Sequence, residues 1–172
     1  MIELRSIVTP TAEEADALYA VVQASPAYYL LVEGRVPDRR TVLDEWFAPN
    51  PALMEGGREK WVFGLWHDGK CVGLIDALKG FMVAEQCMIG LMLVAEPHHR
   101  SGIGREAMRQ FERFAAAHGM RSLRIGVNVD NDRGLAFWRS LGFAETGQRT
   151  RVPGALSDVL IFEKALLRQE AA

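Results

Sequence analysis

A pair of glycines, Gly102 and Gly104, separates a short apolar run from a segment with helical periodicity. The apolar run, 88–94, has the length of a buried strand, and the segment 105–118 repeats apolar residues on one helical face. Because glycine has no side chain, the backbone of such a turn can close on a ligand. Its N–H groups and the helix N-terminus then form an anion site. The pattern favours phosphate binding, although a plain tight turn between a strand and a helix produces the same pair.

Two phosphate-binding fingerprints do not fit this turn. A P-loop ends in Gly-Lys-Ser/Thr, whereas this turn continues as Gly104-Arg105-Glu106. The dinucleotide-binding pattern is built on three glycines, and Ala107 occupies the third position. The turn is therefore predicted to bind phosphate in another way.

The segment 94–104 resembles motif A of the GNAT superfamily of acyl-CoA N-acyltransferases, which is Arg/Gln-x-x-Gly-x-Gly/Ala after a bulged central strand. Gly102 and Gly104 match its glycines, and His99 stands where the family has Arg or Gln; Arg100, the next residue, is the alternative for that phosphate contact. The segment 131–138, followed by Gly-Phe, resembles motif B, Asn-x-x-Ala-x-x-Phe-Tyr. Asn131 matches, whereas Trp138 stands in place of the Tyr.

The resemblance implies that acetyl-CoA is the acyl donor and that no metal is needed. It implies that the backbone of Leu93 and Val94 binds the pantetheine arm and that Asn131 hydrogen-bonds the cofactor while capping its helix. The pyrophosphate would lie on the amides of His99, Arg100, Ser101, Gly102, Ile103 and Gly104. Arg105, Arg109 and His98 are candidates for additional positive charge, although a solvated helix face is the alternative for these side chains.

Transfer of an acetyl group to an amine requires an acceptor for the amine proton and stabilisation of the developing oxyanion. Asp76, which interrupts the apolar strand 72–78, and Glu85, before the central strand, are the candidate bases. Asp76 has three alternatives: binding the substrate ammonium, relaying its proton through water, or facing solvent at the border of the strand. Trp138 cannot protonate the departing thiolate, because an indole N–H is only a hydrogen-bond donor. It is expected to pack against the cofactor arm or in the core.

The resemblance implies that the acceptor is selected by the segment between the first helices and by the last hairpin loop. Tyr28 and Tyr29 are the candidate substrate-binding residues, with Glu33, Trp46 and the turn 149–154 as further candidates. Helix packing is the preferred interpretation of Trp46. The predicted function is transfer of acetyl from acetyl-CoA to a primary amine of a small molecule by direct attack in a ternary complex. The alternatives are a non-catalytic acyl-CoA-binding sensor and an acetyltransferase acting on protein N-termini or lysines.

The order of elements also resembles that of the family. Strands are expected at 2–8, 61–66, 71–78, 88–94, 122–129, 145–152 and 157–163, and helices at 11–24, 38–47, 105–118 and 131–141. Residues 27–32 are too few to classify, 54–60 reads as a loop, and the tail beyond Lys164 is expected to be a short helical end. The fold class is α/β (α+β): one domain over 1–172, with a mixed sheet of about six to seven strands, helices on both faces and a splayed central strand.

Composition sets the remaining limits. A chain of 172 residues is long enough for one domain with a substantial core, and a net charge of -2 argues against a general nucleic-acid binder. Cys71 and Cys87 lie in apolar stretches, which favours buried thiols over a disulfide. No signal-peptide pattern and no bilayer-spanning run is found, so a cytoplasmic protein without membrane partners is the default expectation. Whether the chain forms a homodimer stays open.

Overall fold

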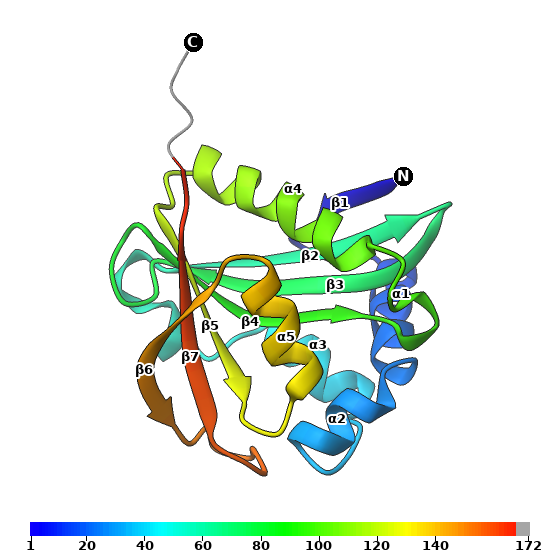
Figure 1. Cartoon of the computed structure of the whole chain (residues 1–172). Coiled ribbons are helices and arrows are strands. Elements are labelled where there is room, and N and C mark those ends of the chain that lie inside the picture. Colours follow the sequence, from blue (N-terminus) through cyan, green and yellow to red (C-terminus); the bar gives the residue numbers. More distant parts are fainter. Residues whose placement is uncertain (168–172) are drawn as a thin grey trace.

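The computed structural model describes residues 1–167 (Figure 1). The strands are β1 (Ile2–Ser6), β2 (Glu59–His67), β3 (Lys70–Lys79), β4 (Gln86–Val94), β5 (Ser122–Asn128), β6 (Ala144–Thr150) and β7 (Val159–Ala165). The helices are α1 (Ala12–Gln23), α2 (Pro26–Val32), α3 (Arg39–Phe47), α4 (Ile103–Ala117) and α5 (Asp132–Ser140), with short 3-10 turns η1 (Pro51–Gly57) and η2 (Glu96–His98).

All seven strands form one mixed sheet in the order β1-β2-β3-β4-β5-β7-β6. Only the pair β4–β5 is parallel. One hydrophobic cluster joins α4 and α5 to one face of the sheet, and a second joins α1, α2 and α3 to the other face (Figure 1). The expected mixed sheet with helices on both faces is confirmed.

Helix α4 forms where the apolar period predicted it. Ile103, Ala107, Phe111 and Ala115 are buried along one face, at the spacing that places side chains on a single stripe. Helix α1 begins with the predicted capping box, because Thr11 Oγ1 accepts from the N–H of Glu14 and the Glu14 carboxylate accepts from the N–H of Thr11.

The central strands β4 and β5 are paired over only half of their length. Their parallel register runs from Gln86 opposite Ser122 to Ile89 opposite Ile125 and then stops. At this point Gly90 is an extra residue in β4, since Asp76 faces Leu91 while the next residue of β3 faces Ile89. The two strands diverge beyond the bulge, so the expected splayed central strand is present.

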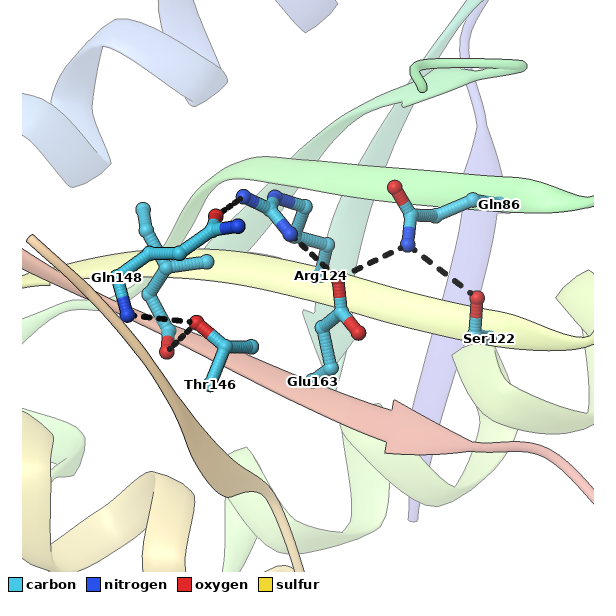
Figure 2. Close-up of polar contacts among 7 residues, drawn as sticks. Gln86, Ser122, Arg124, Thr146, Gln148 and Glu163 are labelled. Atoms are coloured by element: carbon cyan, nitrogen blue, oxygen red, sulfur yellow. Dashed lines mark hydrogen bonds and ion pairs between the residues drawn. The ribbon is translucent and has the colours of Figure 1, made fainter. Parts of the chain in front are cut away.

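A polar network holds the paired end of the splay together (Figure 2). Gln86 Nε2 on β4 donates to Glu163 Oε1 on β7 over 3.1 Å, reaching across β5. Glu163 also pairs with Arg124 of β5, whose Nη2 donates to Gln148 Oε1 of β6. The network thus joins four strands at the end where β4 and β5 are paired, whereas beyond Ile89 and Ile125 these two strands separate.

Several predicted boundaries were wrong. Residues 26–32 form α2, so three helices rather than two precede β2. The expected loop 54–60 contains most of η1 and the start of β2, and β1 ends at Ser6. Both cysteines are free, but only Cys87 is fully buried. β7 continues to Ala165, and the part of the expected helical tail beyond Leu167 lies outside the described residues.

Candidate active site

The splay between β4 and β5 opens into a cavity of about 730 Å³. Its walls are the second half of β4, the turn 98–105, the second half of β5, and the inner sides of α5 and α2. At one end it reaches Gly102 and Arg105, and it is also lined by Gly90 and Tyr28. The cavity therefore joins the glycine turn to the segments from which acceptor residues were expected.

The turn exposes backbone donors to this cavity. Arg100 and Gly102 have positive φ angles of 62° and 82°. Gly102 is the N-cap of α4, and no side chain in residues 1–167 caps this end of the helix. The first N–H groups of α4 are therefore open to an anion, and the helix dipole favours negative charge there. A methyl group on Gly104 would lie 3.3 Å from the Phe137 ring, so glycine fits this close approach best.

The predicted cofactor residues converge on the cavity. All of them except Ser101 line it, namely Leu93, Val94, His99, Arg100, Gly102, Ile103, Gly104, Arg105, Asn131 and Trp138. The Ser101 hydroxyl instead donates to the carbonyl of His98 over 2.6 Å, within the turn.

The positively charged side chains near the turn have different partners. Arg105 reaches across to α5, where Nη2 donates to Ser140 Oγ over 3.1 Å. Arg109 forms two hydrogen bonds with the Glu106 carboxylate and is not among the residues that line the cavity. Arg109 is therefore a residue of the outer face of α4, as the solvated-face alternative predicted.

His99 takes part in an arrangement that sequence reasoning missed. Its Nε2 lies 2.7 Å from the carbonyl oxygen of Val94, and its Nδ1 lies 3.0 Å from Nη2 of Arg133. Arg133 belongs to the first turn of α5 and also lines the cavity. Nothing in the residue pattern distinguished this arginine from an ordinary exposed helix residue.

Motif B positions Asn131 and Trp138 on α5. Asn131 Oδ1 accepts from the N–H of Gly134 over 2.9 Å, which confirms the predicted cap. A Cβ at residue 134 would lie 2.5 Å from the Asn131 side chain, so the glycine there gives this cap its space. Trp138 is 5% exposed, packs edge-on against Phe137 and Phe143, and also lines the cavity.

Asp76 is a buried acid with one basic partner. Its side chain is 3% exposed, and Lys60 Nζ lies 2.7 Å from Oδ1 and 2.8 Å from Oδ2. Burial raises the pKa of Asp76 to about 6, while the charge and hydrogen bond of Lys60 act in the opposite direction. The solvent-facing alternative for Asp76 is therefore wrong.

Asp76 lies directly behind the bulge of β4 and does not itself line the cavity. Gly90 is exposed and lines the cavity, and a Cβ on it would lie 2.9 Å from Asp76 Oδ2. The missing side chain thus leaves free the space next to the carboxylate that a Cβ on residue 90 would fill. Glu85 is exposed, precedes β4 at its paired end, and is absent from the cavity lining.

The two tyrosines of α2 have different surroundings. Tyr28 is half-buried and lines the cavity, whereas Tyr29 is 3% exposed and packs in the core with Trp46. Burial, together with the carboxylates of Glu33 and Glu45, raises the pKa of Tyr28 to about 12. Burial, followed by the charges of Tyr28, Glu33, Glu45 and Asp76, also raises the pKa of Tyr29. The turn 149–154 is exposed and is not part of the cavity lining.

Sequence reasoning also missed Lys60, Gly90 and Asn128. Asn128 is buried at the end of β5, lines the cavity and donates to Ser157 Oγ over 3.2 Å. Asn128 could have been identified as a candidate site residue, because it is a polar residue at the end of a central strand. Lys60 and Gly90 carried no comparable signal, because their roles depend on strand register.

Two further features bear on the class of site. Among residues 1–167, no group of three or more His, Cys, Asp or Glu side chains is placed to hold a metal ion. Within the same residues, none of the helices is long and apolar enough to cross a bilayer.

Comparisons with known proteins identify this arrangement. The profile of the acetyltransferase (GNAT) family matches residues 18–143. An acetyltransferase from Thermus thermophilus superposes with a TM-score of 0.71 at 28% identity, covering 96% of this chain and 97% of that one. The acetyltransferase from Salmonella typhimurium that modifies the N-terminal serine of ribosomal protein L7/L12 superposes with a TM-score of 0.75 at 17% identity, covering 95% of this chain and 94% of that one.

The paia N-acetyltransferase from Thermoplasma acidophilum, solved in complex with coenzyme A, superposes with a TM-score of 0.66 at 17% identity, covering 96% of this chain and 99% of that one. No curated protein sequence matches the chain. The matched profile includes the whole cavity wall from α2 to α5. The chain therefore belongs to the acetyltransferase (GNAT) family, whose enzymes use acetyl-CoA.

Proposed function

We propose that this enzyme transfers the acetyl group of acetyl-CoA to a primary amine of a small molecule by direct attack within a ternary complex. The observation that carries the proposal is the continuity of the cavity. One space of about 730 Å³ contacts the glycine turn, the unpaired half of β4, the Gly90 bulge and Tyr28. Donor and acceptor can therefore meet without a covalent enzyme intermediate.

The residues of the turn fit the phosphates of the donor. Positive φ angles at Arg100 and Gly102 and the uncapped start of α4 provide backbone donors for a pyrophosphate. The unpaired half of β4, including Leu93 and Val94, offers its edge to the pantetheine arm, although the Val94 carbonyl already accepts from His99. Acetyl-CoA supplies the thioester whose acetyl group is transferred. The coenzyme A complex of the Thermoplasma acidophilum structure supports this choice of donor.

Asp76 is the group proposed to receive the proton that the acceptor ammonium loses. Its raised pKa, about 6, leaves it ionised at neutral pH while making it a stronger base than an ordinary carboxylate. Lys60 holds the carboxylate in place, and the bare Gly90 leaves room for contact with the amine, directly or across one water molecule. Glu85 stays a second candidate, but it does not line the cavity and is therefore the weaker one.

A small acceptor is favoured over a peptide by the way α2 meets the loop between β6 and β7. The N–H of Leu156 in this loop donates to the carbonyl of Val32 over 2.9 Å, and a methyl group on Gly34 would lie 3.4 Å from the Leu156 side chain. An extended peptide needs an open groove, and these contacts join the two segments instead. Acetylation of a protein N-terminus, as by the Salmonella typhimurium structural relative, is the alternative outcome.

The test is an acetyl-transfer assay with separate amine and peptide arms. Purified enzyme is incubated with acetyl-CoA and either a panel of small primary amines or a panel of peptides with free N-termini and lysines, and products are identified by mass. We expect acetylation of at least one small amine at a rate above the uncatalysed reaction. Turnover confined to the peptide arm would contradict the small-molecule assignment, and binding of acetyl-CoA without turnover in either arm would indicate a sensor.

A further inference from the structure

Arg133 and His99 form a bridge across the cavity between α5 and the glycine turn. The imidazole of His99 lies between the Val94 carbonyl, 2.7 Å from Nε2, and the Arg133 guanidinium, 3.0 Å from Nδ1. All three residues line the cavity. The bridge therefore spans the splay from the end of β4 to the first turn of α5.

The two partners determine how His99 carries its proton. A carbonyl oxygen only accepts hydrogen bonds, so Nε2 of His99 must carry the hydrogen that it shares with Val94. A guanidinium only donates, so Nδ1 must present a lone pair to Arg133. His99 is thus a neutral imidazole that receives one arginine N–H and fixes the direction of the guanidinium.

The rest of the Arg133 guanidinium is available to a ligand. Arginine has five N–H donors, and one of them bonds to His99. In the described part of the chain, no carboxylate forms an ion pair with Arg133, whereas Arg139 on the same helix pairs with Glu145. A cation that lacks an acidic partner and faces a turn of open backbone donors suits an anion held between them.

We propose that Arg133 binds the pyrophosphate of the donor and that His99 is a positioning residue that holds the guanidinium over the turn. The proposal rests on the proposed function, because it takes the turn to be the pyrophosphate site. It also gives a role to the histidine that replaces the family's Arg or Gln. Instead of contacting the phosphates itself, the side chain at residue 99 directs an arginine from α5 toward them.

The test measures affinity rather than turnover, by calorimetry with coenzyme A, dephospho-coenzyme A and pantetheine. Dephospho-coenzyme A lacks the 3′-phosphate, and pantetheine lacks both the pyrophosphate and the nucleotide. Arg133→Gln should weaken binding of the first two by the same factor, about tenfold or more, and leave pantetheine unchanged. Arg113→Gln is the matched control, since Arg113 is exposed on α4 outside the cavity lining. It should change no affinity by more than about twofold.

The positioning role of His99 has its own readout. His99→Ala should weaken coenzyme A binding, but it should add no further loss in the Arg133→Gln background. His99→Gln should restore affinity, because the Gln side chain can both donate to the Val94 carbonyl and accept from Arg133. Additive losses in the double variant, or no rescue by Gln, would overturn the positioning role.

The remaining outcomes separate this inference from the proposed function. If the unmodified protein binds coenzyme A and Arg133→Gln binds it equally well, the inference is wrong and the proposed function stands. A loss for coenzyme A but not for dephospho-coenzyme A would assign Arg133 to the 3′-phosphate and overturn the pyrophosphate contact. An equal loss for pantetheine would mean that Arg133 acts on the fold, which also overturns that contact. Failure of the unmodified protein to bind coenzyme A would overturn the proposed function, and this inference with it.

Discussion

Asp76 is the residue whose ionisation should set the lower limit of the activity range. Its pKa is raised to about 6, mainly by burial, and only the ionised carboxylate can accept a proton. We therefore expect kcat/KM to fall about tenfold per unit as the pH drops below about 6. Asp76→Asn should remove this acidic limb and lower turnover by about ten- to ten-thousand-fold, with little change in donor affinity. The measurement is kcat/KM between about pH 5 and 8 for both proteins.

A matched control for Asp76 is Asp44→Asn on the outer face of α3, where the carboxylate is exposed and its ion-pair partner within residues 1–167 is Arg40. This variant should keep the acidic limb.

A loss of stability caused by Asp76 does not explain the fall in kcat/KM at low pH. A carboxyl whose pKa is raised from 3.8 to about 6 by folding stabilises the fold more as the pH falls through this window. An acidic limb that survives in Asp76→Asn, with near-normal turnover, would remove Asp76 from the site.

Gly90 should be as necessary as the carboxylate behind it. A methyl group at this residue would lie 2.9 Å from Asp76 Oδ2, closer than a Cβ tolerates, so Gly90→Ala should displace the carboxylate and block its access to the cavity. We expect turnover to fall by about tenfold or more. Gly126→Ala is the control, because it also adds a methyl to a strand that lines the cavity, but at ordinary contact distances of 3.7 Å. Equal rates in the two variants would contradict the role of the bulge.

Trp138 should matter for packing and not for proton transfer. The indole fills space between Phe137 and Phe143, and it has no acidic proton to give at neutral pH. Trp138→Phe should therefore keep turnover within about tenfold while lowering the melting temperature by a few degrees. Steady-state rates and thermal unfolding, measured on one preparation, distinguish a packing role of Trp138 from a role in proton transfer. A rate loss of more than about a hundredfold with intact donor binding would point to an acid–base role instead.

At the scale of elements, the network around Glu163 should stabilise the paired end of the splay. Glu163→Ala leaves the nearly buried Arg124 guanidinium and Gln86 without their shared acceptor, at a cost of about 1–3 kcal/mol in the free energy of unfolding. Thermal unfolding should detect this as a lower melting temperature. Glu145→Ala on β6, whose partner Arg139 is half exposed, should cost about 1 kcal/mol or less. Equal shifts for both variants would show that the network does not hold the strands.

Elements were predictable where a long periodic pattern or a cap marked them, as for α4 and α1. Helix α2 was not, because seven residues with a Pro at the first position and no side-chain cap look the same as a short strand or a loop. The register between the strands could not be predicted from the sequence either. The hairpin turn at Gly69 predicts continuous pairing, but Val72 is an extra residue in β3. This bulge turns Asp76 to the face of the sheet that carries Lys60.

On the scale of the whole molecule, the glycine turn could be located from sequence because all its functional groups are local. The rest of the site could not, since Arg133, Tyr28 and Gly90 come from separate elements whose meeting depends on the splay. The charges are also distributed unevenly around the cavity. Arg100, Arg105 and Arg133 line it near the turn, together with one acid, Glu96, whereas the carboxylates of Glu33 and Glu45 act on Tyr28 in α2. A net charge of -2 conceals this separation, which suits an anionic donor and a cationic amine.

The proposed donor site, with the pyrophosphate on the glycine turn, can be tested at Gly102. Gly102 has a φ of 82° and open space around its Cβ position, so Asp and Asn fit there equally and tolerate the backbone conformation comparably. The two variants differ only in charge. Calorimetric titration with coenzyme A should show that Gly102→Asp loses affinity by on the order of a hundredfold relative to Gly102→Asn, because a carboxylate repels the phosphates. Equal affinity of the two variants for coenzyme A would show that the pyrophosphate does not lie on this turn.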